Sequence, residues 1–429
     1  MEFNKVTVMG LGYVGLPTAA IIATRGIDVI GVDVHQHVVD TINEGNIHIV
    51  EPDLDIAVRS SVMTGKLKAS LTAEPSDVFL IAVPTPFKKG THNKEITSSN
   101  GETTHYPVPD LSYIESACKA LASVLEKGNL VILESTSPVG TTEKVAEWLA
   151  KERPDLSFPQ QAGETADIHI AHCPERVLPG YVLQELISND RIIGGLTKTC
   201  ADHAQLFYER FVKGECITTH ARTAEMAKLT ENSFRDVNIA FANELSIICE
   251  RIHVNVWELI KLSNRHPRVN ILTPGPGVGG HCIAVDPWFI VDSAPEEARL
   301  IATARQVNDG KPLHIIEKVK EAADQFKQPV IACFGLSYKA DIDDLRESPA
   351  LDITMELAKA NVGTVLAVEP NIKTLPPKFD GLDIELVDTN TALEKANTIV
   401  LLVDHKDFKK VPMSDLSSKV VIDSRGIWY

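Results

Sequence analysis

The stretch KVTVMGLGYVGLPTAAIIATRGIDVIGVD, residues 5–33, decides the fold class of this chain. It begins with a short apolar run that ends in glycines, continues with apolar residues at helical spacing, and closes on a second apolar run, Asp28–Asp33. Strand, glycine-rich turn, helix and strand in this order are typical of a nucleotide-binding α/β unit. Further apolar runs at Val78–Val83 and Leu130–Glu134, with helix-like stretches between them, predict a parallel sheet covered on both faces.

The glycines of GLGYVG, residues 10–15, follow the pattern of dinucleotide-binding loops. The first allows a tight turn, the second lets the backbone approach a pyrophosphate, and the third lets the helix pack on the strand. Asp33 stands at the second strand end about 20 residues further on, as the pattern requires. A carboxylate there binds both ribose hydroxyls and repels a 2′-phosphate, so NAD is predicted rather than NADP, although His35 and His37 weaken that preference. The residues predicted to contact the cofactor here are Gly10, Gly12, Tyr13, Val14, Gly15 and Asp33.

The composition narrows the class of protein. At about 100–200 residues per domain, 429 residues predict two to four domains. Lys plus Arg number 42 and Asp plus Glu 58, and the net charge of −16 argues against a nucleic-acid polymer as partner while allowing a local basic pocket for a small anion. Seven cysteines without a CxxC pair predict neither a metal site nor a disulfide framework and indicate a reducing cytoplasm. Neither a signal peptide nor a membrane-inserted helix is expected.

Two further stretches shape the expected organisation. Lys88–Pro109 is polar and rich in Thr, Ser, Asn and Gly, which predicts a long loop or lid. From about Thr223 to Leu262 apolar residues recur every three or four positions without Gly or Pro, which predicts a helix long enough to span two domains. A plain scaffold helix is the alternative for this second stretch.

The last third of the chain follows the same order as the first. Its run Pro329–Gly335 ends in glycine, and Val362–Glu369 ends in an acidic residue, as the first two runs of the chain do. Ala396–Asp404 and Lys419–Asp423 parallel the third and fourth runs. We therefore predict a second Rossmann-like unit. Because LSYK stands where the glycine fingerprint would be, this unit is expected to bind something other than a dinucleotide in the usual pose.

A glycine-rich stretch ahead of Cys282 is the second informative feature. TPGPGVGGHCIAVDPWF, residues 273–289, places four glycines shortly before that cysteine. So flexible a backbone can approach a ligand closely and present a thiol in a pocket. A turn with one buried cysteine is the alternative, because free Cys usually behaves as a small hydrophobe. On the residues alone, nucleophile and buried filler stay equally open.

Seven separated motifs, in order and over almost the whole length, resemble those of the UDP-glucose/GDP-mannose dehydrogenase family. The resemblance implies an α/β fold of two Rossmann-like doubly wound domains joined by a long central helix. The expected parts are an NAD-binding domain at 1–215, a central helical dimerisation and catalytic-loop region at 216–325, and a UDP-sugar-binding domain at 326–429. The motifs are GLGYVGLP (10–17), VPTP (83–86), ESTSPVGTT (134–142), CPER (173–176), AEMAKLTENSF (224–234), GVGGHC (277–282) and FGLSYKADIDDLRESPA (334–350).

The resemblance implies a two-step, four-electron oxidation of a primary alcohol on a nucleotide-linked sugar to a carboxylate, with two NAD per substrate. Cys282 matches the family nucleophile. It attacks the intermediate aldehyde, the thiohemiacetal is oxidised to a thioester, and water releases the acid. The covalent adduct is needed because an aldehyde bears no leaving group, and the adduct supplies a carbon that can still donate hydride.

Other catalytic residues follow from the same motif matches. Lys228 matches a lysine that stabilises negative charge on the reacting oxygen at both steps. Asn232 lies on the same helix face and donates to the same oxygen. Glu175 matches the glutamate assigned to thioester hydrolysis, Asp286 an aspartate that helps position a water, and Thr136 a threonine near the nicotinamide and that water. Spacing alone would make Lys228 a solvated helix lysine.

Cationic groups are also expected around the diphosphate. Lys339 is implied to meet the UDP-sugar and Arg346 the cofactor, whereas Arg235 lies two turns beyond the catalytic lysine. In the family the stretch around His266 and Arg268 reaches into the partner subunit's site, which implies a homodimer with sites completed across the interface. Surface residues without a ligand are the alternative for these last three. The implied substrate-binding residues are Arg176, Val177, Lys228, Asn232, Arg235, His266, Arg268, Gly279, Tyr338 and Lys339, and Thr85, Thr136 and Arg346 are added to the cofactor site.

The chain departs from the glucose-type pattern of the family. Val285 stands where glucose enzymes carry a lysine, Cys173 replaces the Asn of Asn-Pro-Glu, and Arg176–Val177 replace apolar or aromatic residues. These positions resemble the branch that acts on UDP-N-acetyl-hexosamines. Ala284 and Trp288 favour UDP-N-acetyl-D-mannosamine, as in UDP-N-acetyl-D-mannosamine dehydrogenases, and the product would then feed a surface polysaccharide. A UDP-N-acetylglucosamine or N-acetylgalactosamine 6-dehydrogenase is the alternative in the same class.

Two alternatives come from other classes. A nucleotide-sugar-binding or NAD-sensing protein without turnover would not depend on Cys282. A simple hydroxyacid dehydrogenase would share the first Rossmann unit, but it would release one NADH per substrate and leaves the Cys282 loop unexplained.

Overall fold

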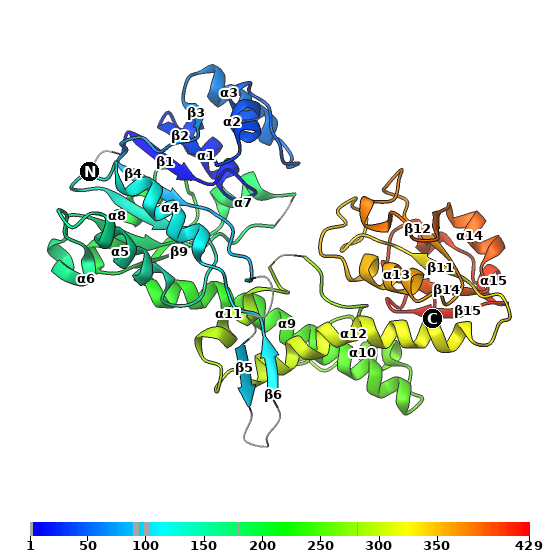
Figure 1. Cartoon of the computed structure of the whole chain (residues 1–429). Helices are drawn as coiled ribbons and strands as arrows, with labels where there is room; N and C mark the ends of the chain where they lie inside the picture. The colour runs from blue at the N-terminus through cyan, green and yellow to red at the C-terminus, as the bar shows by residue number, and fades with distance from the viewer. Residues whose placement is uncertain (1–2, 89–93, 98–102, 179, 281) are drawn as a thin grey trace. The chain divides into compact units, whose positions relative to one another are not determined.

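A computed structural model describes residues 3–88, 94–97, 103–178, 180–280 and 282–429 of the chain (Figure 1). The chain forms two compact units, residues 1–231 with 289–297 and residues 232–288 with 298–429. The boundary between them falls within one helix, α9 (Ala221–Arg251).

The first unit is built on an eight-stranded sheet with the order β10-β9-β8-β7-β4-β1-β2-β3. Neighbouring strands are parallel except β8 and β9. The six strands from β3 to β8 therefore have the Rossmann order 3-2-1-4-5-6. Central strands such as β4 (VFLI) and β7 (LVIL) are apolar and buried throughout, as expected where helices cover both faces. The strands are β1 (Lys5–Met9), β2 (Asp28–Val32), β3 (Leu67–Ser70), β4 (Val78–Ile81), β7 (Leu130–Leu133), β8 (His169–His172), β9 (Arg191–Gly195) and β10 (Cys216–His220).

Helices cover the two faces of this sheet (Figure 1). The sheet separates two apolar clusters, one on each face. One face carries α1 (Gly15–Thr24), α2 (Gln36–Asn43), α3 (Leu54–Met63), α7 (Val182–Ser188) and α8 (Lys198–Tyr208). The other carries α4 (Ser112–Ala122) and α5 (Thr141–Glu152). The shorter elements α6 (Pro159–Ala162) and η1 (Gly163–Thr165) follow α5.

The second unit contains a five-stranded parallel sheet with the order β13-β12-β11-β14-β15, which is again 3-2-1-4-5. One face packs against α12 (Arg299–Ala323) and α13 (Pro349–Lys359), and the other against α14 (Thr389–Lys395) and α15 (Met413–Leu416). The predicted α/β fold with two Rossmann-like units is thus confirmed. The remaining elements are β11 (Val330–Phe334), β12 (Thr364–Val368), η2 (Pro377–Phe379), β13 (Ile384–Leu386), β14 (Thr398–Leu401), η3 (Phe408–Lys410) and β15 (Val420–Asp423).

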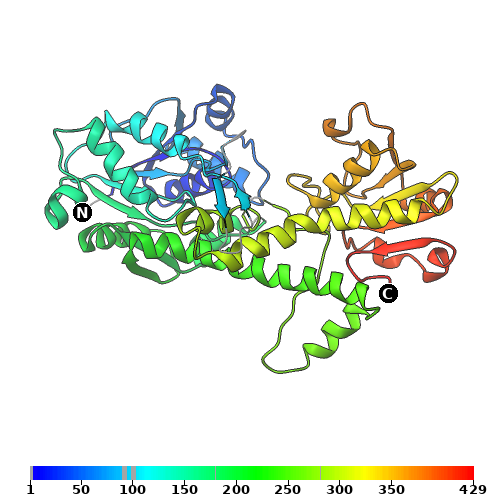
Figure 2. The ribbon, with the colours of Figure 1, turned by 60° about the horizontal axis from the view of Figure 1, so that its bottom comes forward.

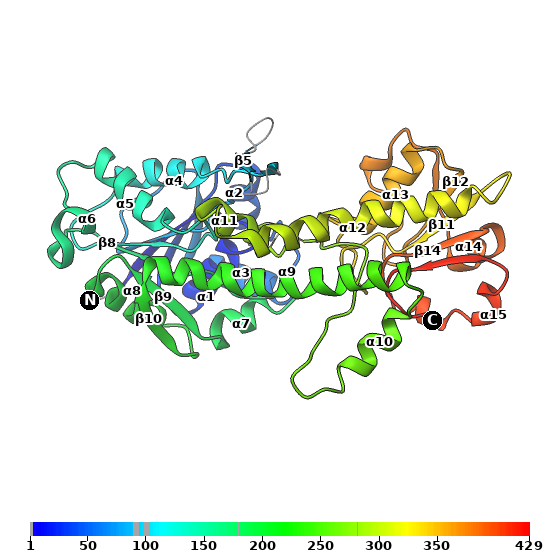
Figure 3. The ribbon, with the colours of Figure 1, turned by 90° about the horizontal axis from the view of Figure 1, so that it is seen from below.

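The central helical stretch is divided where a single helix was expected. α9 ends at Arg251, and α10 (Val256–Ser263) follows after a turn in which His253 has φ +58°. Asn255 starts α10, because its side-chain oxygen accepts from the backbone N–H groups of Trp257 and Glu258. From Asn232 onward α9 runs alongside α12 (Figures 2 and 3). There the buried Arg305 pairs with Asp236.

The expected loop at 88–109 is wrong for the part that is described. β5 (Lys94–Thr97) and β6 (Thr103–Tyr106) pair as antiparallel strands, and Phe87 bridges to Pro109 beside them. The β-branched residues of KEIT and TTHY suit a hairpin despite the polar composition. Residues 89–93 and 98–102 of the predicted loop, like residues 1–2, 179 and 281, lie outside the described residues. Among those that are described, no helix is both long and apolar enough to cross a membrane.

Candidate functional site

The carboxyl ends of parallel strands collect the predicted site residues of the first unit along one sheet edge. Gly10 follows β1, Asp33 follows β2, Thr85 follows β4, Thr136 follows β7 and Glu175 follows β8. This edge is where ligands bind in open α/β sheets, because loops and helix N-termini meet there. Topology therefore brings together five residues that lie far apart in the sequence.

The glycine loop has the close approaches that the dinucleotide pattern requires. Gly10 has φ +94°, and a Cβ on it would lie 2.6 Å from the carbonyl oxygen of Ala82. A Cβ on Gly15 would lie 1.9 Å from the oxygen of Gly10, so α1 can start here only with glycine. Among the described residues, none beyond the two chain neighbours of Gly12 lies within 4 Å of a Cβ added there, which leaves room for a ligand over that backbone. The predicted contacts Tyr13 and Val14 complete the turn, and Tyr13 is exposed.

Asp33 is held at the end of β2 by the loop it is predicted to serve. Its Oδ2 accepts from the N–H of Leu11 at 3.1 Å and its Oδ1 from the N–H of His35 at 3.0 Å. Across the same edge, the hydroxyl of Thr85 donates to the carbonyl oxygen of Thr136 at 2.6 Å. A tight glycine cradle with a carboxylate beside it fits the pyrophosphate and ribose of NAD.

Glu175 lies in a buried ion pair that the sequence did not reveal. Its Oε2 accepts from Nη1 of Arg191 at 3.0 Å, and its Oε1 accepts from the backbone N–H of Arg176 at 2.5 Å. Arg191 is 3% exposed and also donates to the carbonyl oxygen of Leu186. Both carboxylate oxygens of Glu175 are therefore oriented by fixed donors.

A second buried carboxylate, Glu134, stands behind this pair. The hydroxyl of Tyr208 donates to its Oε1 at 2.6 Å, and the Arg191 guanidinium lies 5.6 Å from the centre of the Tyr208 ring. Burial raises the pKa of Glu134 to about 7. It also raises the pKa of the neighbouring Cys173 thiol to about 12, which makes that cysteine inert.

Arg176 and Lys228 lie near the point where the sheet edge meets α9. Arg176 forms a two-point ion pair with Glu231, at 2.6 and 3.1 Å, beside a surface cavity of about 350 Å³. Lys228 is half-buried on α9 and belongs to the first unit. Val177 is half-buried and packs against the apolar core of that unit rather than standing free.

The second unit carries Cys282. The structure describes all seven cysteines, and six are buried whereas Cys282 is exposed. The backbone N–H of Asp286 donates to the carbonyl oxygen of Cys282 at 2.9 Å, in the turn that leads into α11 (Asp286–Ser293). The Asn232 amide donates to the buried Asp286 carboxylate at 2.5 Å. Cys282, Asp286 and Asn232 thus form one connected group, and the Asn232 amide that was predicted to contact substrate oxygen is bonded to Asp286.

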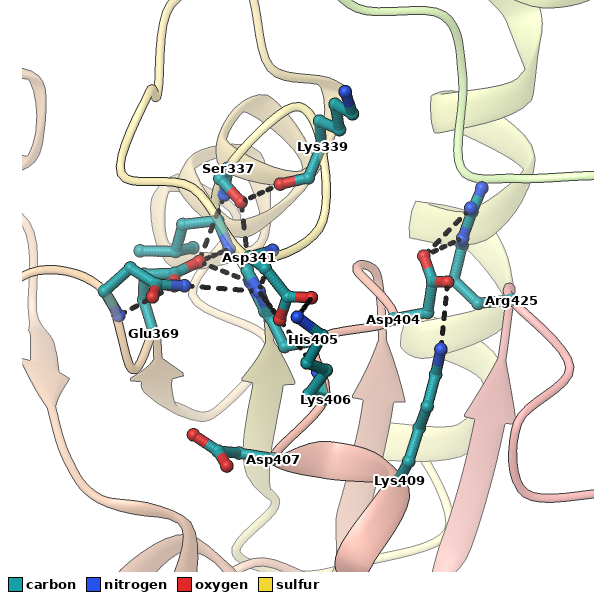
Figure 4. Close-up of polar contacts among 12 residues, drawn as sticks. Ser337, Lys339, Asp341, Glu369, Asp404, His405, Lys406, Asp407, Lys409 and Arg425 are labelled. Carbon is teal, nitrogen blue, oxygen red and sulfur yellow. Dashed lines mark hydrogen bonds and ion pairs between the residues drawn. The ribbon is translucent and has the colours of Figure 1, made fainter. Parts of the chain in front are cut away.

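A cavity of about 230 Å³ lies at the carboxyl edge of the second sheet. Gly279 of the cysteine loop lines it together with Tyr338 and Lys339, which follow β11. Asp404 and Arg425, which follow β14 and β15, also line it, and they form an ion pair at 2.9 Å (Figure 4). Sequence reasoning missed these last two, although their position just beyond predicted strands was a usable signal.

The remaining predicted ligand residues all belong to the second unit. Arg346 forms a two-point ion pair with Asp344, at 2.6 and 2.9 Å. Arg235, His266 and Arg268 are exposed in the second unit, and the N–H of Arg268 donates to the ring of His266. Within the described part of the chain, no group of His, Cys, Asp and Glu residues is arranged to hold a metal ion.

Comparison with known proteins places this geometry in a family. The UDP-glucose/GDP-mannose dehydrogenase family matches through its NAD binding domain at residues 4–212, its central domain at 222–310 and its UDP binding domain at 332–429. An NDP-N-acetyl-D-galactosaminuronic acid dehydrogenase of Ralstonia nicotianae is 62% identical over 100% of this chain and 97% of its own. A UDP-N-acetyl-D-mannosamine dehydrogenase of Campylobacter jejuni is 61% identical over 98% and 99%.

Among solved structures, a UDP-N-acetyl-mannosamine dehydrogenase of Staphylococcus aureus is 42% identical, with a TM-score of 0.81 over 99% of this chain and 95% of that one. The similarity therefore covers both units and the helical stretch between them. The glycine cradle, Asp33 and the matched NAD binding domain agree on NAD as cofactor. The chain belongs to the UDP-glucose/GDP-mannose dehydrogenase family of NAD-dependent enzymes.

Proposed function

We propose that this chain oxidises UDP-N-acetyl-D-mannosamine to UDP-N-acetyl-D-mannosaminuronate in the cytoplasm, for a surface polysaccharide. The exposed Cys282 is the observation that supports an oxidation as far as the acid. Its carbonyl oxygen accepts from the backbone N–H of Asp286, and the carboxylate of Asp286 accepts from the Asn232 amide. Full-length similarity to UDP-N-acetyl-D-mannosamine dehydrogenases supports the substrate.

The chain binds each ligand with separate groups. The glycine loop and Asp33 hold NAD, which supplies the hydride acceptor for both oxidations. Tyr338 and Lys339, with Gly279, provide the cavity wall against which the UDP-sugar binds. Lys228 stabilises negative charge on the sugar oxygen as the hydroxyl loses its proton.

Cys282 makes the second oxidation possible. Its Sγ forms a bond to the aldehyde carbon, the aldehyde oxygen takes up a proton, and the resulting thiohemiacetal is oxidised to a thioester. Water then adds to the thioester carbonyl, the C–S bond breaks, and the sulfur leaves as thiolate. Glu175, with its two oxygens oriented by Arg191 and the Arg176 N–H, accepts the proton of that water.

A second substrate is favoured by one observation. The relative from Ralstonia nicotianae, named for N-acetyl-D-galactosaminuronic acid, is 62% identical over the whole chain. UDP-N-acetyl-D-galactosamine is therefore the second candidate. The two sugars differ in configuration at two ring carbons, C2 and C4, and share the primary alcohol at C6, so the same Cys282 chemistry applies to both.

We further propose that the protein is a homodimer, with the parts 1–215, 216–325 and 326–429 serving as cofactor, dimerisation and sugar-nucleotide regions. Phe234, Phe241 and Ile248 are exposed at seven-residue spacing on α9, and so form one apolar stripe on that helix. A second copy of the chain would cover this stripe and bring His266 and Arg268 toward the partner's site.

The stoichiometry of NADH tests the reaction, and a panel of sugars tests the substrate. Purified protein is incubated with NAD and a limiting amount of UDP-N-acetyl-mannosamine, -galactosamine or -glucosamine. Two NADH per sugar and a uronic acid product are expected with the manno epimer. One NADH per sugar would contradict the cysteine pathway. Turnover with the galacto or gluco sugar alone would show that UDP-N-acetyl-mannosamine is not the substrate. Cys282→Ala should abolish acid formation, and a variant that still forms acid would sink the proposal.

A further inference from the structure

His405 is a fully buried polar residue at the carboxyl edge of the second sheet, just beyond β14 (Figure 4). It belongs to none of the motifs that point to the reaction. A buried polar side chain is retained in a fold only where hydrogen bonds replace its lost contacts with water. The partners of His405 therefore indicate what it holds in place.

The hydrogen bonds of His405 give its two ring nitrogens different roles. The backbone N–H of Asp341 donates to Nδ1 at 2.9 Å, so this nitrogen carries no proton. The opposite nitrogen, Nε2, lies 3.0 Å from Oε2 of Glu369 and donates to it. Nδ1 thus reaches the backbone of Asp341, and Nε2 reaches the side-chain carboxylate of Glu369.

Glu369 extends this contact to the start of the loop after β11. Its Oε2 also accepts from the N–H groups of Leu336 and Ser337, at 2.8 and 3.2 Å, and its Oε1 accepts from the backbone and side chain of Asn371. In the first unit Asp33 occupies the corresponding strand end and accepts one N–H on each oxygen. The acidic residue after the second strand thus accepts from loop N–H groups in both units, and in the second unit it is bonded to His405 as well.

The far end of the same loop is held directly by His405. Asp341 has φ +62°, a strained value for a residue other than glycine, and such strain persists only where neighbours hold it. The N–H of Asp341 is bonded to His405, and its Oδ1 accepts from the N–H of Lys406. Residues 336–341 are thus anchored at both ends by the Glu369–His405 pair.

The segment between the anchors presents Tyr338 and Lys339 to the 230 Å³ cavity. The hydroxyl of Ser337 donates to the Lys339 carbonyl at 2.7 Å, and the Lys339 side chain points away from the Glu369–His405 pair (Figure 4). Ordering such a loop only when a ligand binds would cost conformational entropy, so a loop held in advance binds more tightly.

We propose that His405 is a positioning residue of the sugar-nucleotide site, where it acts with Glu369 to hold the 336–341 loop and its Tyr338 and Lys339 ready for UDP. This inference rests on the proposed function, because it takes Lys339 as a ligand-binding group. It adds to that function a residue that never touches the ligand.

UDP alone is the probe, and the dissociation constant is measured by calorimetry on the full chain. His405→Leu removes both bonds and is expected to weaken UDP binding about 10- to 100-fold, for the loss of two hydrogen bonds. His405→Asn keeps an acceptor near the Nδ1 position for Asp341, and His405→Gln keeps a donor near the Nε2 position for Glu369. The dissociation constants of both variants for UDP are expected to lie between those of the wild type and His405→Leu. These two variants provide the test if His405→Leu does not fold.

A matched control separates positioning from general destabilisation. Leu416→Ala removes a buried side chain from the apolar cluster beside α15, in the same unit but away from the loop. It should lower the melting temperature and leave UDP binding within twofold of the wild type. With UDP-sugar as substrate, the His405 variants should raise KM for the sugar nucleotide while KM for NAD stays unchanged.

UDP binding by all three His405 variants within twofold of the wild type would overturn the inference, as would an equal loss in Leu416→Ala. A wild type that binds no UDP would overturn it as well. A wild type that binds UDP but oxidises no UDP-sugar would refute the proposed function alone, and the loss of UDP binding in His405→Leu would then still support the positioning role.

Discussion

Glu175 is positioned by Arg191, a buried arginine that no motif predicted. The 3.0 Å bond from Arg191 orients one carboxylate oxygen, and the N–H of Arg176 orients the other. A base that must take a proton from one particular water depends on such orientation, because a displacement of about 1 Å can cost about 100-fold in rate.

The first prediction concerns this pair. Arg191→Met keeps an unbranched side chain, although a shorter one, and removes the cation, so hydrolysis of the thioester should slow about 100-fold. Stopped-flow absorbance should show a burst of NADH followed by a slow phase. Arg153→Met is the control, because Arg153 lies in the same unit but donates to Asp155 and to the carbonyl oxygens of Ala122 and Leu125. A wild-type trace from Arg191→Met would show that Glu175 does not depend on Arg191.

The second prediction concerns pH and Glu134. Burial raises the pKa of this carboxyl from 4.5 to about 7 in the folded protein. Its contribution to stability is therefore fully present below pH 4.5 and is lost as pH rises through 7, a change of about 3 kcal/mol. Glu134→Gln cannot ionise, so its melting temperature relative to the wild type should rise between pH 5 and pH 8.

The control for that titration is Glu143→Gln. The Arg222 guanidinium holds the pKa of Glu143 below its usual range, so Glu143 stays ionised throughout pH 5 to 8. The difference in melting temperature between Glu143→Gln and the wild type should therefore not change with pH. A Glu134→Gln difference that is equally flat would mean that Glu134 does not titrate in this range.

At the scale of elements, the start of α5 depends on a residue from another helix. Helix N-termini leave backbone N–H groups without partners inside the helix. Here the buried Glu225 of α9 accepts from the N–H of Gly140 at 2.6 Å and from the N–H and hydroxyl of Thr142 at 2.8 and 2.6 Å. This contact fixes the end of the segment that carries Thr136.

The third prediction follows from this cap. Glu225→Ala leaves two buried N–H groups unsatisfied and should destabilise the protein by about 2 kcal/mol. Calorimetry should record a melting temperature lower by about 4–8 °C. Glu225→Gln retains one acceptor and should lose less. Glu143→Ala breaks a surface ion pair with Arg222 beside the same turn and should change little; a comparable loss there would contradict the specific role of Glu225.

At the scale of the whole molecule, one topology serves two purposes. Both sheets contain the order 3-2-1-4-5, and both place an acidic residue after the second strand of that order. Asp33 bonds two backbone N–H groups beside a glycine cradle, whereas Glu369 is bonded by the loop after β11, Asn371 and His405. The lost glycine fingerprint and the Asn371 and His405 contacts of Glu369 distinguish the second unit from the first, in agreement with the UDP binding domain that matches residues 332–429.

The fourth prediction tests the proposed dimer. Phe241→Glu places a charge in the middle of the α9 stripe and should convert a dimer to a monomer in sedimentation velocity at micromolar concentration. The control is Leu313→Glu, which makes the same kind of change at an exposed position of α12. A monomeric wild type, or a variant that stays dimeric, would contradict the stripe as an interface.

Much of the fold was predictable because its signals are local. The runs ending at Gly10 and Asp33, and their counterparts ending at Gly335 and Glu369, predicted strands that the structure places within a few residues. The 88–109 region was not predictable in the same way, because the residues of β5 and β6 are largely polar and lack the apolar alternation that marks a half-buried strand. The break after α9 had a signal that was overlooked, since Asn255 is a strong helix-starting residue.

The glycine cradle, the acidic strand ends and the cysteine loop could be identified from the amino-acid sequence, because each depends on residues close together in the chain. The side chains that support them could be identified only in the folded protein. Arg191 reaches Glu175 across 16 residues, Tyr208 reaches Glu134 across 74, and His405 reaches Asp341 across 64. Such pairs depend on how strands are ordered in a sheet and on what is buried between its helices. No local periodicity records that order, and it therefore becomes visible only in the folded chain.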